Sequence, residues 1–211
     1  MKIAILGTGR VGGTLGRRWS QGGHHVVFGS RTPEDARVKQ LLAECGENAE
    51  AVSLAQAVQA ADVVIMALPW HVAQEELSKH DFDGKVLVDC TNPLNAQFTG
   101  LDLGFDTSAA EAIAAWAKGA RVVKAFNTVS SAAMADPTFD GQPAAMFYCG
   151  DDEQAKAIVG SLAGELGFDA VDAGDLKVAR LIEPLAMLYI HMAVNRGWGS
   201  RRAFRVVERG G

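Results

Sequence analysis

Three glycines near the start of the chain form the first chemically informative pattern. Residues 7–12 read GTGRVG, a G-x-G-x-x-G motif that follows an apolar run over 2–6 and opens a stretch of helical spacing. In such a turn Gly7 allows the tight bend, Gly9 lets a pyrophosphate approach the backbone, and Gly12 lets the helix pack on the strand. Free amides and the positive helix end then bind phosphate. The loop residues expected to contact a dinucleotide are Gly7, Thr8, Gly9, Arg10, Val11 and Gly12.

The second informative pattern follows about 20 residues later, where the chain reads FGSR. An NAD-binding protein would place an Asp or Glu here to hydrogen-bond the ribose hydroxyls. Arg31 instead offers a planar fork of donors that suits an oxygen-rich dianion, and Ser30 adds a hydroxyl donor. A 2′-phosphate is the ligand that fits this pair, so the sequence predicts NADP(H) over NAD(H). Arg10 is expected either to join this pocket or to face solvent.

The loop after the fourth predicted strand reads LPWH. Leu68 and Pro69 are expected to border the nicotinamide, because ligands of an open parallel sheet lie beyond the carboxyl ends of its strands. His71 could donate a proton, but a capping or surface role in the first helical turn is favoured. Trp70 either covers the cofactor ring or caps the core.

The two following strand-end loops carry amides and hydroxyls. Asn92 is expected to contact the cofactor, and Asn127 and Thr128 either orient a carboxamide or ring carbonyl or cap the next helix. The loops hold no Ser-His-Asp order, no HExxH motif and no evident acid–base pair. We therefore name no catalytic residue and no metal ligand; the candidates near the reacting rings are Pro69, Trp70, His71, Asn127 and Thr128.

The elements that must position these loops alternate between short apolar runs and helical spacing, which is typical of a mainly parallel sheet. Strands are expected over 2–6, 25–28, 51–52, 62–68, 85–89 and 121–126, and then over 144–149 and 168–173. Helices are expected to start at Thr32, with Pro33 and Asp35 in the first turn, and at Ser53, and to span 108–117 and 152–166. The fold class is α/β: a Rossmann-type, doubly wound, mainly parallel sheet with a small helical C-terminal part.

The division predicted is a Rossmann domain over 1–127 and a small α/β extension over 128–211. One long helix is expected over 175–195, in which Leu181, Leu185, Leu188 and Met192 recur at helical spacing and are expected to face the core. Pro184 is expected to kink this helix or to break it early. The apolar character of the helix also favours a homodimer.

The composition, the net charge and the cysteine spacing of the chain limit the classes of protein to which it can belong. The 211 residues are 48% hydrophobic and carry a net charge of −5, which argues against nucleic-acid and membrane-surface partners. No apolar run reaches the roughly 18 residues of a membrane span. Three isolated cysteines suggest reduced thiols rather than disulfides or zinc. A cytoplasmic protein that acts on a small molecule is expected.

Several segments together resemble the 5-deazaflavin-dependent (coenzyme F420-dependent) NADP oxidoreductases. They are MKIAILGTGRVGGTLGRRW, FGSR, ALPW, KAFNT, YCGDDEQAK, DAGDL followed by RLIE, and the GWG of the tail, so the likeness runs through nearly the whole chain. The chain is similar, more distantly, to the NADPH-oxidising domains of membrane ferric reductases and to the N-terminal domains of pyrroline-5-carboxylate reductases.

The resemblance implies an NADP-binding Rossmann domain whose C-terminal part closes over a deazaflavin or flavin, with direct hydride transfer between the rings. It also implies that Thr8, Ser30 and Arg31 hold the adenosine phosphate and that Asn127 and Thr128 lie near the acceptor. The arginine-rich tail would lie near the acceptor or at a subunit interface, or would be a solvated terminus; its members are Arg196, Arg201, Arg202, Arg205 and Arg209.

Two departures from the family pattern stand out: Asp35 stands where the family can place a basic residue, and Asn127 where some members have histidine. Two other functions stay open from the residues: an imine reductase of the pyrroline-5-carboxylate type, and a non-catalytic NADPH-binding regulatory module.

Overall fold

The computed structural model describes residues 1–209, which form one eight-stranded sheet of order β10-β9-β6-β5-β4-β1-β2-β3 and a separate β7-β8 hairpin. Neighbouring strands of the large sheet are parallel except β6 and β9. The order β3-β2-β1-β4-β5-β6 is that of a doubly wound dinucleotide-binding sheet, which confirms the predicted fold class. The strands are β1 (Lys2–Leu6), β2 (His25–Gly29), β3 (Ala49–Val52), β4 (Val63–Met66), β5 (Val86–Asp89), β6 (Arg121–Lys124), β7 (Thr138–Phe139), β8 (Gln142–Pro143), β9 (Ala145–Gly150) and β10 (Asp169–Asp172).

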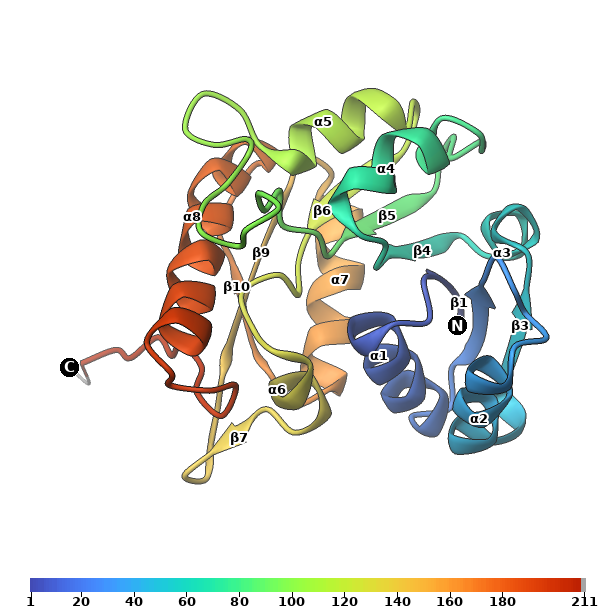
Figure 1. Ribbon diagram of the computed structural model, residues 1–211, viewed down its shortest axis with the longest axis horizontal. Helices are drawn as coiled ribbons and strands as arrows, with labels where there is room; N and C mark the ends of the chain where they lie inside the picture. Colours follow the sequence, from blue (N-terminus) through green and yellow to red (C-terminus); the bar gives the residue numbers. More distant parts are fainter. Residues whose placement is uncertain (210–211) are drawn as a thin grey trace.

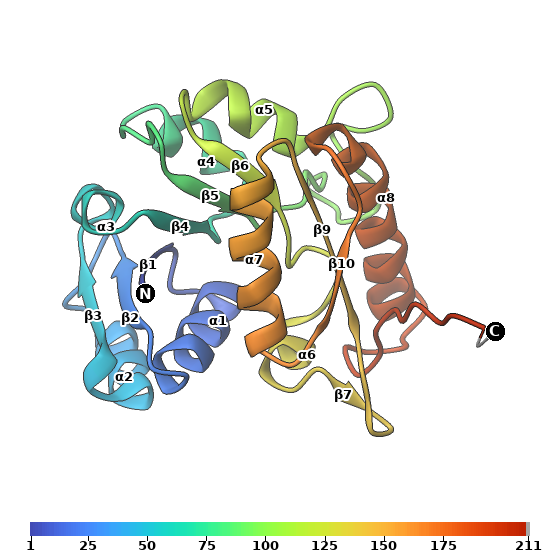
Figure 2. The same cartoon turned by 180° about the vertical axis from the view of Figure 1, so that it is seen from behind.

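Helices cover both faces of the sheet (Figures 1 and 2). One buried cluster joins the sheet to α1, α2, α6 and α7, and a second joins its other face to α3, α4, α5 and α8. Figure 1 shows α8 at the opposite side of the molecule from α2 and β3. The helices are α1 (Arg10–Gln21), α2 (Ala36–Cys45), α3 (Leu54–Ala60), α4 (Trp70–Leu77), α5 (Ala109–Trp116), α6 (Ser131–Ala135), α7 (Glu153–Glu165) and α8 (Ala179–Ile190).

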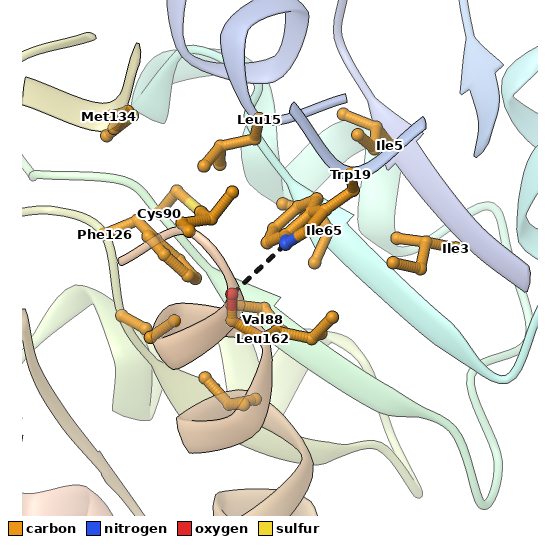
Figure 3. Close-up of a cluster of buried hydrophobic side chains, with 14 of the residues drawn as sticks. Ile3, Ile5, Leu15, Trp19, Ile65, Val88, Cys90, Phe126, Met134 and Leu162 are labelled. Atoms are coloured by element: carbon orange, nitrogen blue, oxygen red, sulfur yellow. Dashed lines mark hydrogen bonds between the residues drawn. The ribbon is translucent and has the colours of Figure 1, made fainter. Parts of the chain in front are cut away.

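The first core cluster joins the N-terminal and C-terminal parts of the chain (Figure 3). Trp19 of α1 packs edge-on against Phe126, with ring centroids 5.7 Å apart. Its indole Nε1 donates to the carbonyl oxygen of Leu162 in α7 at 3.2 Å. The helix that begins at the glycine loop is therefore packed against a helix of the C-terminal part.

The helix predicted to start at Thr32 begins later. Asp35 is the N-cap of α2 and accepts from the backbone N–H of Arg37 at 2.8 Å, so the prediction of Thr32 as N-cap was wrong. A turn over 32–35 comes first, because the Asp35 N–H donates to the Thr32 carbonyl. The predicted start at Ser53 is confirmed, since Ser53 and Gln56 form a reciprocal capping box.

Strands β4 and β6 are each shorter than predicted. β4 ends at Met66 and β6 at Lys124, whereas the apolar runs continue for two more residues. After β6 the buried Phe126 has a positive φ of 61°, which turns the chain out of the strand. An apolar run in the sequence indicates which residues are buried and does not indicate where a strand ends. Here the buried residues continue from the strand into the loop.

The C-terminal helix shows the largest departure. The predicted segment 175–195 divides into a short turn at Leu176–Val178, the helix α8, and a wider turn at His191–Asn195. Leu181 and Leu188, predicted to face the core, are 71% and 50% exposed. The buried face is instead formed by Ala179, Ile182, Glu183, Ala186 and Tyr189.

The physical reason for this error is that two faces of the helix have the same apolar spacing. Leu181, Leu185 and Leu188 recur at intervals of four and three, and so do Ile182, Ala186 and Tyr189. Periodicity identifies a helix but cannot choose between faces that both repeat. Pro184 lies inside α8, which continues past it. Within residues 1–209, no helix combines the length and the apolar character that a bilayer crossing demands.

Candidate functional site

The carboxyl ends of the central strands lie side by side, so their loops form one edge. The Gly7 N–H donates to the Gly29 carbonyl at 3.1 Å, which joins the loops after β1 and β2. The Ala67 N–H donates to Leu6 at 3.0 Å and the Cys90 N–H to Met66 at 3.2 Å, which adds the loops after β4 and β5. The order reverses between β1 and β4, the position at which such sheets bind ligands.

The glycine loop has little room for side chains where it turns. Gly7 has a φ of 111°, and a Cβ there would lie 2.7 Å from the Ala67 carbonyl oxygen. A Cβ on Gly12 would overlap the Gly7 carbonyl oxygen. A Cβ on Gly9 would meet no atom within 4 Å, so the space in front of this residue is open. Gly9 is the N-cap of α1, no side chain caps that helix, and its first turn holds no acidic residue. The backbone amides at the start of α1 can therefore bind a phosphate.

Ser30 and Arg31 follow β2 at the same edge. Ser30 is buried, and its hydroxyl oxygen accepts from the Thr32 N–H at 3.1 Å, which leaves its own proton to donate. Arg31 is exposed, and within residues 1–209 its guanidinium has no hydrogen bond or ion pair. The nearby acids are engaged, because Asp35 caps α2 and Glu34 pairs with Lys39 at 2.9 Å. The arrangement leaves Arg31 free for an anionic ligand.

The four residues of the loop after β4, Leu68 to His71, lie in different environments. Pro69 is the exposed N-cap of α4, and Leu68 is half-buried beside the glycine loop, because its side chain would lie 3.5 Å from a Cβ on Gly7. Trp70 packs on the core and against Trp116, with ring centroids 5.3 Å apart. His71 is exposed in the first turn of α4. This geometry favours the core-capping role for Trp70 and the surface role for His71.

Asn92 and Asn127 form a reciprocal pair that joins the loops after β5 and β6. The Asn92 side-chain amide donates to the Asn127 carbonyl oxygen at 3.0 Å, and the Asn127 side-chain amide donates to Asn92 Oδ1 at 3.0 Å. Asn127 Oδ1 and Thr128 Oγ1 are both buried, and neither has a hydrogen-bond partner among residues 1–209. Buried polar atoms are normally paired, so these two fit a ligand that supplies a hydrogen-bond donor, such as a carboxamide.

Asp89, Lys124 and Glu183 form a buried charge cluster that was not predicted from the sequence, although the lysine within the apolar run RVVKAF was a signal. All three side chains are fully buried. Lys124 Nζ lies 2.8 Å from Asp89 Oδ2 and 2.8 Å from Glu183 Oε1, and it donates to the Thr91 carbonyl oxygen at 2.6 Å. Burial opposes the charge of Lys124, but the two carboxylates outweigh it and its pKa is raised. Burial raises the pKa of Glu183.

The C-terminal tail and the end of α8 enclose a pocket of about 190 Å³. Tyr189 forms part of its wall, and the buried Tyr189 hydroxyl has no hydrogen-bond partner in the described part of the chain. Arg202 lies over the Trp198 ring at 4.3 Å from its centroid, and both line the pocket with Phe204. Arg202 alone of the five tail arginines lines it; Arg205 donates to Gln142 instead.

The tail is held next to the loop after β6. Ser130 Oγ donates to the Ser200 carbonyl oxygen at 2.8 Å. Ser130 follows Thr128 by two residues, so the segment that leads into the pocket lies beside the loop with the unpartnered amide oxygen and hydroxyl.

The comparisons with known proteins show the family of this chain and also a second group of relatives. Residues 2–93 match the family described as NADP oxidoreductase, coenzyme F420-dependent. An F420-dependent NADP reductase from Methanocaldococcus jannaschii is 32% identical over 95% of this chain and 97% of that protein. A crystal structure from Arthrobacter sp. FB24, described as that of a "putative F420-dependent NADP-reductase", has a TM-score of 0.85 and 30% identity over 99% of this chain and 100% of that one. Metalloreductase STEAP3 of Rattus norvegicus is 33% identical over 89% of this chain, but over 37% of its own length.

Proposed function

Since this chain belongs to the F420-dependent NADP oxidoreductase family, we propose that it transfers a hydride between NADP(H) and a 5-deazaflavin. The observation that carries the proposal is the unpartnered pair, Asn127 Oδ1 and Thr128 Oγ1, at the same sheet edge as the glycine loop. The amides of α1 would hold the phosphates of a dinucleotide, and Asn127 and Thr128 would accept hydrogen bonds from its carboxamide.

The NADP(H) contacts that we propose follow the loops in order. The amides of the glycine loop hold the pyrophosphate, and Ser30 and Arg31 hold the 2′-phosphate. Leu68 and Pro69 border the nicotinamide, and Asn92 holds Asn127 in place. The remaining loop residues that we assign to cofactor binding are Gly7, Thr8, Gly9, Arg10, Val11 and Gly12.

The reaction we propose is direct transfer. The nicotinamide supplies a hydride that the deazaflavin accepts, or the reverse. The chain itself contributes positioning. The amide pair, Asn92 and Asn127, orients one ring, and the neighbouring side chains exclude water. No side chain is assigned a proton transfer, because the strand-end loops carry mainly amides, hydroxyls and prolines, and their histidine, His71, is exposed in the first turn of α4.

We propose that the extension over residues 128–211, of which the structure describes 128–209, builds the acceptor site on the Rossmann domain. This part adds β9 and β10 to the sheet and supplies the pocket between α8 and the tail. The Trp198 ring offers an apolar surface to a flat ring system, the Tyr189 hydroxyl offers a donor, and Arg202 offers a positive charge to an acidic substituent.

Arg31→Ala is expected to weaken NADPH binding by about 1–3 kcal/mol, the scale of a charge-assisted hydrogen bond, and to leave NADH binding nearly unchanged. The 2′-phosphate is the only difference between the two cofactors. Isothermal titration calorimetry of the protein with each cofactor measures both changes in binding free energy. Arg37→Ala is the matched control, because Arg37 is also an exposed arginine near the end of β2 but lies beyond the cap of α2. Equal losses for NADPH and NADH would remove the 2′-phosphate assignment.

The test of the function is the absorbance of an oxidised deazaflavin after addition of NADPH. Loss of the deazaflavin absorbance, with NADPH consumed in equal amount, supports the proposal. Turnover of NADPH only with a cyclic imine would replace it by imine reduction. Tight NADPH binding without turnover of deazaflavins, flavins, ferric chelates or imines would identify a regulatory module.

We further propose that two copies of this chain associate through the outer face of α8. Leu181 and Leu188 are exposed there, and Val206 and Val207 of the tail are exposed as well. These exposures support the proposal, because large apolar side chains left open to solvent often mark an association site. Sedimentation of the unaltered protein should give a dimer and that of Leu188→Glu a monomer; a monomer in both would contradict the proposal.

The three cysteines are free, and we propose a cytoplasmic location on that ground.

A further inference from the structure

The buried charge cluster joins the two halves of the site through contacts that the hydride transfer itself does not use. Lys124 uses all three of its ammonium protons, on Asp89, Glu183 and the Thr91 carbonyl oxygen. A fully satisfied buried network of this kind holds its members in one arrangement. Three elements therefore keep fixed positions around the Lys124 ammonium: β5, β6 and α8.

The first arm of the cluster fixes the loop after β5. Asp89 Oδ1 accepts from the Thr91 N–H at 2.8 Å and from the Thr91 hydroxyl at 2.7 Å. With the bond from Lys124 to its carbonyl, Thr91 has three hydrogen bonds to the cluster. The next residue is Asn92, which pairs with Asn127, and Asn127 lies three residues after Lys124. The amide pair is thus held from both of its strands.

The second arm of the cluster fixes α8. Glu183 Oε2 accepts from the Ala109 N–H at 2.9 Å and Glu183 Oε1 accepts from the Ala110 N–H at 3.1 Å. The carboxylate therefore caps the start of α5 as well as pairing with Lys124. Tyr189, which lines the C-terminal pocket, lies six residues further along α8, about 9 Å along the helix axis. The position of the pocket wall is thus linked to Lys124.

We propose that Asp89, Lys124 and Glu183 are positioning residues that set the distance and angle between the nicotinamide edge and the C-terminal pocket. The inference rests on the proposed function, because it assigns the two rings to these two places. None of the three side chains touches either ring. Their effect reaches the reaction through Thr91 and the amide pair on one side and through α8 on the other.

Glu183→Gln tests this proposal, because it removes one charge and leaves an amide group facing the Ala109 N–H. We expect kcat with NADPH and a deazaflavin to fall about tenfold or more, since a small misplacement of reacting groups costs rate. The Kd for NADPH should change by less than about threefold, because the phosphate contacts lie elsewhere. Amide hydrogen exchange over residues 90–95 should become faster.

The matched control is Glu111→Gln. Glu111 of α5 accepts from Arg180 of α8 at 2.7 and 2.8 Å, so it also joins these two helices, but at a half-exposed place with no contact to Thr91. Its substitution should leave kcat and the exchange of residues 90–95 unchanged. Equal losses of kcat in both variants, or an unchanged kcat in Glu183→Gln, would overturn the positioning role.

A second pair of variants covers the case that Glu183→Gln does not fold. Thr91→Val keeps the shape of the side chain and loses the hydroxyl bond to Asp89, whereas Thr91→Ser keeps that bond. We expect Thr91→Val to lower kcat and Thr91→Ser to keep kcat near that of the unaltered protein. Equal kcat values in the two variants would contradict the proposal. If the unaltered protein does not reduce a deazaflavin, the proposed function fails, and amide exchange over residues 90–95 still tests whether the cluster holds the loop after β5.

Discussion

Replacing Lys124 with methionine is expected to lower the free energy of unfolding by about 3–5 kcal/mol, the cost of removing one partner from a buried ion pair. Methionine has a similar length, so the variant leaves little empty volume. What it leaves is two buried carboxylates, Asp89 and Glu183, without the ammonium that lies 2.8 Å from each. Urea denaturation followed by tryptophan fluorescence measures the change.

The control for this variant is Lys79→Met. Lys79 pairs with Glu75 and Glu76 on the surface of the molecule, and exposed ion pairs contribute little. Its stability should therefore match that of the unaltered protein. If Lys124→Met were as stable as Lys79→Met, the buried charge cluster would have no part in the stability of the fold.

The effect of Lys124→Met is expected to depend on pH and on Glu183. Burial already raises the pKa of the Glu183 carboxyl, and loss of the cation raises it further. A carboxyl with a raised folded-state pKa contributes a penalty that is absent below the pKa of the unfolded chain and grows as pH rises toward the folded-state pKa. The deficit of Lys124→Met should therefore shrink in acid. Adding Glu183→Gln should recover part of it at neutral pH, whereas additive losses would contradict this account.

Gly9→Ala is expected to weaken NADPH binding by about 10- to 100-fold, the equivalent of one or two charge-assisted hydrogen bonds. The added Cβ meets no protein atom within 4 Å and the φ of −76° suits alanine, so the protein itself can accept it. The cost arises only when a pyrophosphate must approach the backbone at this place. Stability should change by no more than about 1 kcal/mol, the scale of a helix N-cap.

Substitutions of two neighbouring glycines, Gly12 and Gly13, distinguish effects on NADPH binding from effects on stability. In Gly12→Ala the Cβ would overlap the Gly7 carbonyl oxygen, so both stability, by about 1–3 kcal/mol, and NADPH affinity should fall. In Gly13→Ala the Cβ would lie 3.5 Å from Leu41, an ordinary contact, and stability should rise by about 0.5–1 kcal/mol. Fluorescence titration with NADPH and urea denaturation measure the two quantities. Normal NADPH affinity in Gly9→Ala would remove the glycine loop from the cofactor site.

The fold was predictable where the local pattern admits one solution. The alternation of apolar runs with helical spacing predicts the parallel sheet, and its central strands appear within two residues of their expected bounds. The capping box at Ser53 was also predictable, because both of its hydrogen bonds lie within four residues. The start of α2 was not, because Thr32 and Asp35 are both good N-caps and the turn after Ser30 decides between them.

For the candidate site, the sequence indicates the chemistry of single loops but not the contacts between loops. The glycine loop and the Ser30–Arg31 pair come from contiguous residues, so their chemistry is visible in the chain. The pairing of Asn92 with Asn127 spans 35 residues and could be expected only as a common edge of two loops. The pocket around Tyr189 could not be expected, since it needs the tail to fold back against α8.

From its residues alone this chain specifies a doubly wound α/β fold and a glycine loop beside an arginine where NAD-binding proteins place an acid. Those features depend on local conformation and on side chains near one another in sequence. Only the tertiary structure decided which face of α8 is buried, because Leu181 and Ile182 begin equivalent apolar repeats. The choice follows from Glu183, which lies on the buried face and is stabilised there by Lys124, a residue 59 positions earlier in the chain. Contacts over such separations are set by how the elements pack, and no local pattern encodes them.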